Sequence, residues 1–318
     1  KGEDEGTLHP HRISGAERGY RSTQRSRPFA RVRMSTMTFA ETGHSSRTVS
    51  LSDIVAGHRL SAGEAALGLC EVLERLACGG CPGFLDEPTP TVLEGLRDYL
   101  SSLVEVDLPT GIGTGHDPVR VRRLLVALAR GISTEISIST LASDEGLTRE
   151  TVSSYLAALT RVFAIEDPPA WSSHLRSKAA LRKEGKRHLA DPSLAVAALR
   201  ADPQSLLCDL HYAGQLFESQ AVHDPRVYSG QLVRHARDSA GAEVDAVIEY
   251  PGSPLLLIEI KLCFHEGVID AALASLARFA AKIDSALHPD VVRLIITGGG
   301  YAFTCPDGVK VVPLTALT

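Results

Sequence analysis

The sequence predicts an α+β protein of several domains, with helices in the first half and a mixed β-sheet in the last third. Helical periodicity recurs between residues 50 and 159, and an unbroken apolar run, Leu255 to Ile258, directly follows a Pro-Gly turn. Such a run is typical of a strand that is covered on both faces. With 318 residues, 44% of them hydrophobic, the chain can bury the cores of two or three domains.

The composition excludes some classes of protein. A formal charge of −5 gives no overall nucleic-acid signature, so such binding has to come from local patches. Only Cys78 and Cys81 have metal-like spacing, and a zinc ribbon needs a second pair, so we expect free cysteines in a reducing cytoplasm. The sequence has no apolar run of membrane-spanning length and no hydrophobic signal core at its start. We therefore expect a cytoplasmic protein without a membrane partner.

The amino-terminal part predicts a tail followed by a small helical subdomain. Residues 1–33 are polar and rich in arginine and glycine, which is typical of a disordered tail. Helical patterns follow over residues 51–60, 64–76 and 91–106, and a loop rich in Gly and Pro occupies residues 78–90. These helices predict a subdomain that ends near residue 110.

The next segment has the pattern of a helix-turn-helix with a wing. Glu145-Gly146-Leu147 predicts the tight turn, Thr148 caps the last helix, and residues 163–167 are the candidate wing. Arg149 lies at the start of the helix that would enter a major groove. The same pattern also fits a protein-binding or linker module. The predicted helices are Val119 to Arg130, Ile138 to Asp144 and Thr148 to Leu159.

A basic run lies between Trp171 and His188 and contains the single acid Glu184. Such a run can neutralise several phosphates and give salt-dependent binding to nucleic acid. A solvated loop is the equally open alternative. The cations proposed for contact are Arg176, Lys178, Arg182, Lys183, Lys186 and Arg187, together with Arg149.

The carboxy-terminal part predicts an α/β domain around a hairpin. Strands are expected over residues 244–250, 255–261, 291–297 and 309–313. Helices are expected on both sides of the hairpin, at residues 194–200, 206–222 and 271–283. Helices that flank a mixed sheet define an α/β layer arrangement.

The hairpin brings together groups that could form a metal site. Glu259 and Lys261 share one strand face, and Asp245 is expected within about one residue of the position opposite Glu259. Asp245, Glu259 and the carbonyl of Ile260 could hold Mg²⁺, and Lys261 could orient a water molecule or a phosphate. Glu218, on the preceding helix, is a candidate third acid. In the alternative interpretation Lys261 only neutralises Glu259, and Asp245 and Glu218 are ordinary surface charges.

These residues resemble known families. The spacing of Asp245, Glu259 and Lys261 resembles the restriction-endonuclease-like nucleases. The whole chain after about residue 12 resembles prokaryotic AAA-type ATP-binding proteins whose carboxy-terminal part is domain of unknown function 4143. The stretches that carry this second resemblance are Ser14-Gly15-Ala16, VRMSTMTFAETG, Gly79-Gly80-Cys81-Pro82-Gly83, LTRETVSSYLAAL, PPAW, KRHLADPSLA, LFESQAV and the hairpin.

The resemblance implies an ATPase domain, a helical lid, a winged helix and a restriction-endonuclease-like domain. It gives the tail of an ATPase domain at residues 1–46, a lid-like subdomain at 47–110, a winged helix at 111–170 and the nuclease-like domain at 171–318. The resemblance also implies that the acids and the lysine of the nuclease-like site correspond to Glu218, Asp245, Glu259 and Lys261.

The sequence departs from this family at its start. No G-x-x-x-x-G-K-[ST] motif occurs, so ATP is expected only in full-length relatives and this chain is expected to be a fragment without ATPase activity. Three functions follow as hypotheses: a nucleic-acid-binding or regulatory module, a Mg²⁺-dependent nuclease, and an adaptor for a partner ATPase chain.

Overall fold

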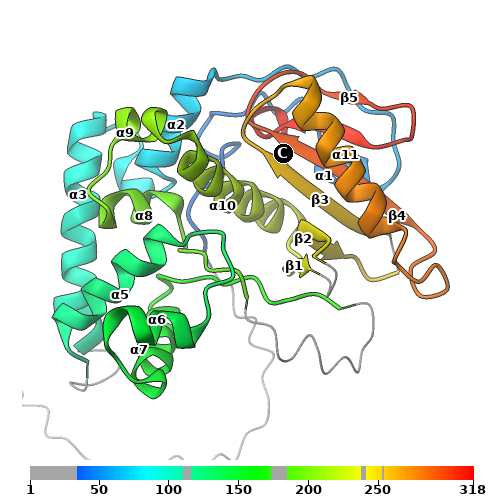
Figure 1. Cartoon of the computed structure of the whole chain (residues 1–318). Helices are drawn as coiled ribbons and strands as arrows, with labels where there is room; N and C mark the ends of the chain where they lie inside the picture. The colour runs from blue at the N-terminus through cyan, green and yellow to red at the C-terminus, as the bar shows by residue number, and fades with distance from the viewer. Residues whose placement is uncertain (1–33, 110–115, 173–184, 238–240, 253) are drawn as a thin grey trace, which may run out of the picture. The chain divides into compact units, whose positions relative to one another are not determined.

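The computed structural model describes residues 34–109, 116–172, 185–237, 241–252 and 254–318. Residues Ser35–Thr318 form one compact unit. Figure 1 shows helices at one end of this unit and a β-sheet at the other. The described part of the chain is therefore a mixed α+β fold, as the sequence predicts.

Ten α-helices lie within the described residues, and most of those predicted are confirmed with shifted ends. Helix α1 stops after five residues, although the apolar periodicity extends to Leu60. Helix α10 continues past Pro225 to a left-handed Gly230, whereas the pattern predicts an end at Val222. The helices are α1 (Leu51–Val55), α2 (Leu69–Cys78), α3 (Thr89–Ser102), α5 (Pro118–Arg130), α6 (Ile138–Glu145), α7 (Arg149–Arg161), α8 (Pro192–Ala198), α9 (Pro203–Cys208), α10 (Leu210–Ser229) and α11 (Glu266–Ala280).

Side-chain caps fix where several of these helices begin. Asp117, Ser137 and Thr148 each accept a backbone amide of the first turn of α5, α6 and α7. Such caps satisfy amides that the helix itself leaves without partners. Gly146, in the left-handed conformation at φ 63°, ends α6 and allows the tight turn into α7.

The sheet has six strands in the order β1-β2-β3-β4-β6-β5. Strands β1, β2 and β3 are antiparallel neighbours, whereas β3, β4 and β6 run parallel. The sequence analysis does not predict β1 or the short β5. The strands are β1 (Val233–Arg237), β2 (Glu243–Glu249), β3 (Leu255–Lys261), β4 (Val291–Thr297), β5 (Phe303–Thr304) and β6 (Lys310–Pro313).

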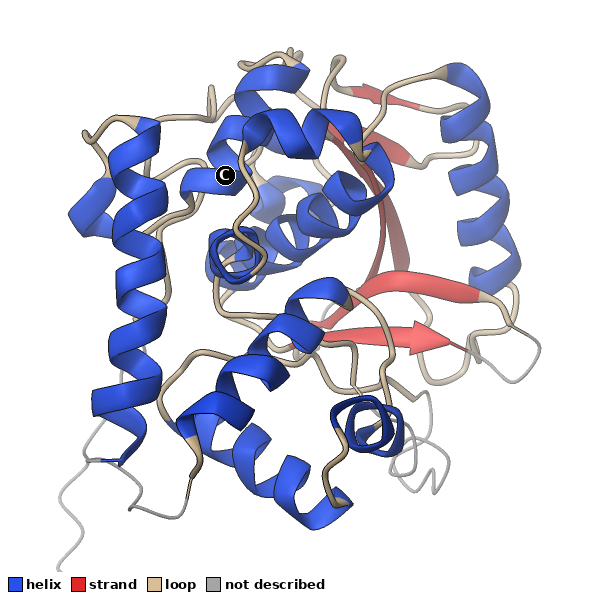
Figure 2. Cartoon of the chain, turned by 60° about the vertical axis from the view of Figure 1, so that its left-hand side comes forward, coloured by secondary structure: helices blue, strands red, loops and turns tan. Residues whose placement is uncertain are grey.

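Both faces of the sheet are covered, which explains the unbroken apolar run in β3. Leu256 and Ile258 pack in the cluster that contains α10, while Leu255 and Leu257 pack in the cluster that contains α11. All four are at most 2% exposed. Figure 2 shows the sheet between helices on one side and α11 on the other.

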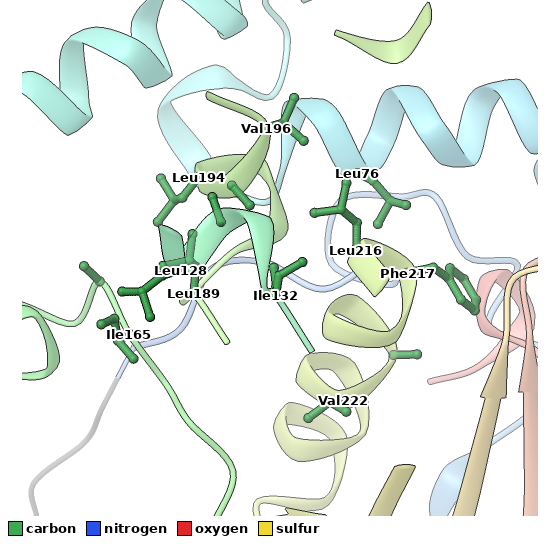
Figure 3. Packing of buried hydrophobic residues seen from close by; sticks show 14 of the residues in the cluster. Leu76, Leu128, Ile132, Ile165, Leu189, Leu194, Val196, Leu216, Phe217 and Val222 are labelled. Carbon is green, nitrogen blue, oxygen red and sulfur yellow. The ribbon is translucent and has the colours of Figure 1, made fainter. Parts of the chain in front are cut away.

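The cluster on the α10 side continues into the helical part of the unit. Leu216, Phe217 and Val222 of α10 belong to the same buried cluster as Leu76 of α2 and Leu128 of α5 (Figure 3). Helix α10 also contacts β1, β2 and β3. The helical part and the sheet therefore share one core. The expected domain limits at residues 46, 110 and 170 stay predictions.

The stretch that precedes α1 is integrated into this unit. The amide of Phe39 donates to the buried Asp224 on α10 (3.1 Å), and Val49 pairs with Leu317 near the end of the chain. Residues 35–46, which we expected to belong to the tail of an ATPase domain, thus contact both α10 and the last residues of the chain. None of the described helices has the length and apolar character needed to cross a bilayer.

Candidate functional site

Six charged side chains meet at the end of the sheet where β2 begins and β3 ends. We call them the acid-lysine cluster. It comprises Lys186, Glu218, Glu243, Asp245, Glu259 and Lys261.

The hairpin register brings Asp245 and Glu259 together. Ala246 of β2 pairs with Ile258 of β3, so the next position on each strand places Asp245 opposite Glu259. Asp245 Oδ2 also accepts the amide of Ile260 (2.8 Å). The expected proximity of these two acids is therefore confirmed, and it follows from the two-residue period of the strands.

Lys261 lies between the two hairpin acids. Its Nζ is 3.1 Å from Glu259 Oε1 and 3.6 Å from Asp245 Oδ2, and its side chain is 31% exposed. Burial disfavours its charge, but Asp245 and Glu259 outweigh burial and raise the pKa of Lys261. Lys261 is thus a charged group that keeps partial access to solvent.

Lys186 is a second ammonium group in the cluster, and the sequence analysis assigned it to a different role. Its Nζ is 2.7 Å from Glu218 Oε1, 2.8 Å from Glu243 Oε1 and 3.5 Å from Asp245 Oδ1, and its side chain is only 5% exposed. Burial opposes the charge, yet these carboxylates raise the pKa of Lys186. The expectation that Lys186 contacts nucleic acid from the surface is wrong, because three carboxylates enclose its ammonium group.

The segment that carries Lys186 is held on both sides by backbone hydrogen bonds. The amide of Arg187 donates to Thr134 O (2.9 Å), and the amide of Glu166 donates to His188 O (2.9 Å). These bonds hold the segment between residues 134 and 166, and the ion pairs of Lys186 connect it to α10 and β2. The stretch expected as a wing at residues 163–167 thus forms one side of this pairing.

The cluster has more acids than bases. Four carboxylates face two ammonium groups, so the cluster carries two unbalanced negative charges when every acid is ionised. Burial, reinforced by the charge of Asp245, raises the pKa of Glu218 to about 8 and that of Glu259 to about 7. Protons or an added cation can supply the missing positive charge.

The residues fit a metal held by few protein ligands. Glu259 Oε2 is buried and has no hydrogen-bond partner among the described residues, so it is an oxygen with free ligand capacity. Among the described residues, no group of three or more His, Cys, Asp and Glu side chains is arranged to hold a metal ion. Mg²⁺ commonly binds through one or two carboxylates and keeps several waters, so the pair Asp245 and Glu259 suits it without a full protein cage.

The remaining predicted cations fall into three groups. Arg187 is buried and forms an ion pair with Asp167, so the expectation that it contacts phosphates from the surface is also wrong. Arg149 is exposed at the start of α7. Arg176, Lys178, Arg182 and Lys183 lie outside the described residues.

Comparison with known proteins gives one similarity. Residues 71–205 match the family model of a domain of unknown function, DUF8612. No curated protein and no solved structure matches the chain. The matched region runs from within α2 to within α9 and includes Lys186, but it ends before the four acids and Lys261.

Proposed function

We propose that the acid-lysine cluster is a Mg²⁺-dependent centre that cleaves phosphodiester bonds of nucleic acid. The observation that supports this most is the imbalance of charge: four buried or half-buried carboxylates converge around two lysines, and the described part of the chain gives Glu259 Oε2 no hydrogen-bond partner. A buried excess of carboxylates is unfavourable unless a cation or protons neutralise it. A divalent ion supplies the two missing charges.

The order of elements also supports a nuclease-like domain. Helix α10 with Glu218 precedes the antiparallel strands β1, β2 and β3, and α11 then connects β3 to the parallel strand β4. This arrangement agrees with the restriction-endonuclease-like fold that the spacing of Asp245, Glu259 and Lys261 resembles.

Each residue has a role in this proposal. Asp245 and Glu259 would hold the metal, whose chemistry is to lower the pKa of a bound water and to polarise a phosphate oxygen. Lys261, being partly exposed, would bind the scissile phosphate or orient the attacking water. Lys186 would hold Glu218 and Asp245 in place, because its ammonium group contacts both.

The proposal is tested by incubating the full chain with single-stranded and duplex DNA and RNA, with and without Mg²⁺ or Mn²⁺. We expect metal-dependent cleavage that Asp245→Asn, Glu259→Gln and Lys261→Met each lower by at least about a hundredfold. Asp270→Asn is the matched control, because it removes an exposed carboxylate from α11. Absence of cleavage in the wild type, or equal cleavage by all four variants, would contradict the proposal.

A second candidate is a nucleic-acid-binding or regulatory module whose cluster is purely structural. The observation that favours it is the position of Lys186, which already places a positive charge among Glu218, Glu243 and Asp245. The three-helix unit α5 to α7, proposed as a winged helix with Arg149 at its surface, would then contact DNA.

The two candidates differ in their response to Asp245→Ala. Salt-sensitive binding to DNA that persists in this variant, without cleavage in the wild type, would favour the binding module. The adaptor for a partner ATPase chain stays a prediction from the family resemblance.

A further inference from the structure

A small cavity between α3, α5 and α8 has a strongly positive lining. Its volume is about 140 Å³, and its lining contains Arg97, Arg122 and Arg200, the hydroxyl-bearing Ser101, and apolar residues such as Leu100 and Leu125. None of the described residues that line it carries a carboxylate. We call it the arginine cavity. It lies wholly within the region that matches DUF8612 and uses none of the residues of the acid-lysine cluster.

Two of the three guanidinium groups have no partner among the residues that the structure describes. Arg122 forms an ion pair with Glu105 at 2.6 Å. For Arg97 and Arg200, the described residues provide no hydrogen bond or ion pair, and Arg97 Nε is buried. Asp202 is near enough to Arg97 to interact with its charge, but its Oδ1 already accepts the amide and hydroxyl of Ser205 at 2.7 and 2.6 Å. Arg97 Nε is therefore a buried hydrogen-bond donor that lacks an acceptor among the described residues, whereas Arg122 and Arg200 are exposed at the rim of the cavity.

The backbone at Arg200 adds an independent observation. Arg200 has a φ of 54°, in the left-handed region that glycine usually occupies. The amide of Arg200 donates to Ala197 O (3.1 Å) and that of Ala201 to Val196 O (3.0 Å), which is the Schellman pattern at the end of a helix. Glycine is the favoured residue at this position of the motif. Helix α8 thus ends with an arginine where the backbone alone would favour glycine, and this arginine lines the cavity.

We propose that the arginine cavity binds a phosphate group. Guanidinium groups present forked N–H donors that match the oxygens of phosphate, and phosphate accepts several charge-assisted hydrogen bonds at once. A volume of about 140 Å³ corresponds to roughly four or five water molecules. The cavity therefore admits one phosphate group, and a nucleoside attached to it would lie outside.

The phosphate can be free or the end group of a nucleotide, and the test separates these sources. Titration calorimetry of the full chain would compare inorganic phosphate with adenosine monophosphate, with chloride adjusted to equal ionic strength. We expect saturable binding with a Kd of about 1 mM or below. Equal affinity for the two ligands would identify free phosphate, and tighter binding of the monophosphate would identify a nucleotide end group.

Two variants decide whether the arginines bind the ligand. Arg200→Gly removes a guanidinium while giving the backbone its favoured residue, so a loss of binding in a well-folded protein can only come from the missing side chain. Arg97→Gln removes the guanidinium that has a buried donor. Each variant should weaken phosphate binding by about tenfold or more. Arg161→Gln, at the exposed end of α7, is the matched control and should bind like the wild type.

Three results would overturn the proposal. The first is no saturable phosphate binding by the wild type beyond the effect of chloride. The second is unchanged affinity in Arg97→Gln and Arg200→Gly. The third is an equal loss of affinity in Arg161→Gln, which would show a general effect of net charge. None of these results depends on metal binding or nuclease activity.

Discussion

The sheet end and the helical end of this protein differ in the sign of the charge that they leave uncompensated. At the sheet end, four carboxylates surround two lysines. At the helical end, Arg97, Arg122 and Arg200 line a cavity, and of these only Arg122 forms an ion pair among the described residues, with Glu105. The excess of carboxylates is unfavourable in isolation, because buried charge is stable only when it is paired. At the helical end Arg122 and Arg200 are exposed, and the group that lacks an acceptor among the described residues is the buried Nε of Arg97. The comparison shows that the two ends should bind ligands of opposite charge.

The largest change in stability is expected when Lys186 is removed from the sheet end. Lys186→Met should lower the free energy of unfolding by about 3–5 kcal/mol at pH 8, because Glu218, Glu243 and Asp245 would lose their shared counter-ion. Urea denaturation measures the change. Lys282→Met, at an exposed position after α11, should alter stability by less than about 0.5 kcal/mol. A small effect of Lys186→Met would mean that the cluster does not depend on this lysine.

The shared core predicts that the two ends unfold together. Phe217→Ala on α10 should lower the free energy of unfolding by about 3–5 kcal/mol, because the fully buried ring lies in the cluster that contacts both the helices and the sheet. Hydrogen exchange should then show equal loss of protection in α2 and β3. Loss confined to one end would show that the core is divided.

A further prediction concerns the dependence of stability on pH, to which the buried His188 contributes. Burial, with the charge of Lys186, lowers the pKa of His188 from 6.5 to about 3. Below pH 6.5 the unfolded chain therefore binds a proton that the folded chain does not bind. His188 by itself should therefore lower stability by about 1.4 kcal/mol per pH unit, or about 2 kcal/mol between pH 6.5 and 5.0, while Glu218 and Glu259, whose pKa values are raised, contribute in the opposite direction.

The matched variant for this effect is His188→Asn, which can keep a hydrogen bond to Ser219 but cannot take up a proton. Thermal or urea unfolding at several pH values gives the slope of the free energy of unfolding against pH. This slope should be smaller in His188→Asn than in the wild type, by the contribution of one bound proton. Identical slopes for the variant and the wild type would contradict burial of a neutral His188.

The smallest expected effect lies at the helical end. Arg200→Gly should raise the free energy of unfolding by about 0.5–1 kcal/mol, because glycine adopts the left-handed conformation without strain. Arg200→Ala, which keeps the strain and removes the guanidinium, should give no such gain. A loss of stability in Arg200→Gly would show that the arginine side chain stabilises the fold itself.

The sequence predicts the hairpin site well because its determinants are local. The apolar run and the alternation around Asp245, Glu259 and Lys261 set strand register within about twenty residues. Lys186 cannot be assigned in this way, because its partners Glu218 and Asp245 lie 32 and 59 residues away. In the sequence it is one lysine in a basic run, and only the tertiary structure separates it from that run.

Two other features were not predicted from the sequence for the same reason, because they depend on distant segments of the chain. Strand β1 contains Arg234, His235 and Arg237 and lacks an apolar pattern, yet His235 is fully buried and bridges Ala170. The arginine cavity draws its three guanidinium groups from separate segments of the chain, so no local motif indicates it. Contacts between distant segments, rather than propensity, determine these features.

The central claim is that the sheet end binds a cation and the helical end binds an anion. Its most direct test is calorimetric titration of the full chain with Mg²⁺. The account predicts saturable binding at millimolar metal that Asp245→Ala and Glu259→Ala abolish and that Arg97→Gln and Arg200→Gly leave unchanged. Absence of Mg²⁺ binding by the wild type, or binding that persists in both acid variants, would contradict it and would leave the acid-lysine cluster as a set of structural ion pairs.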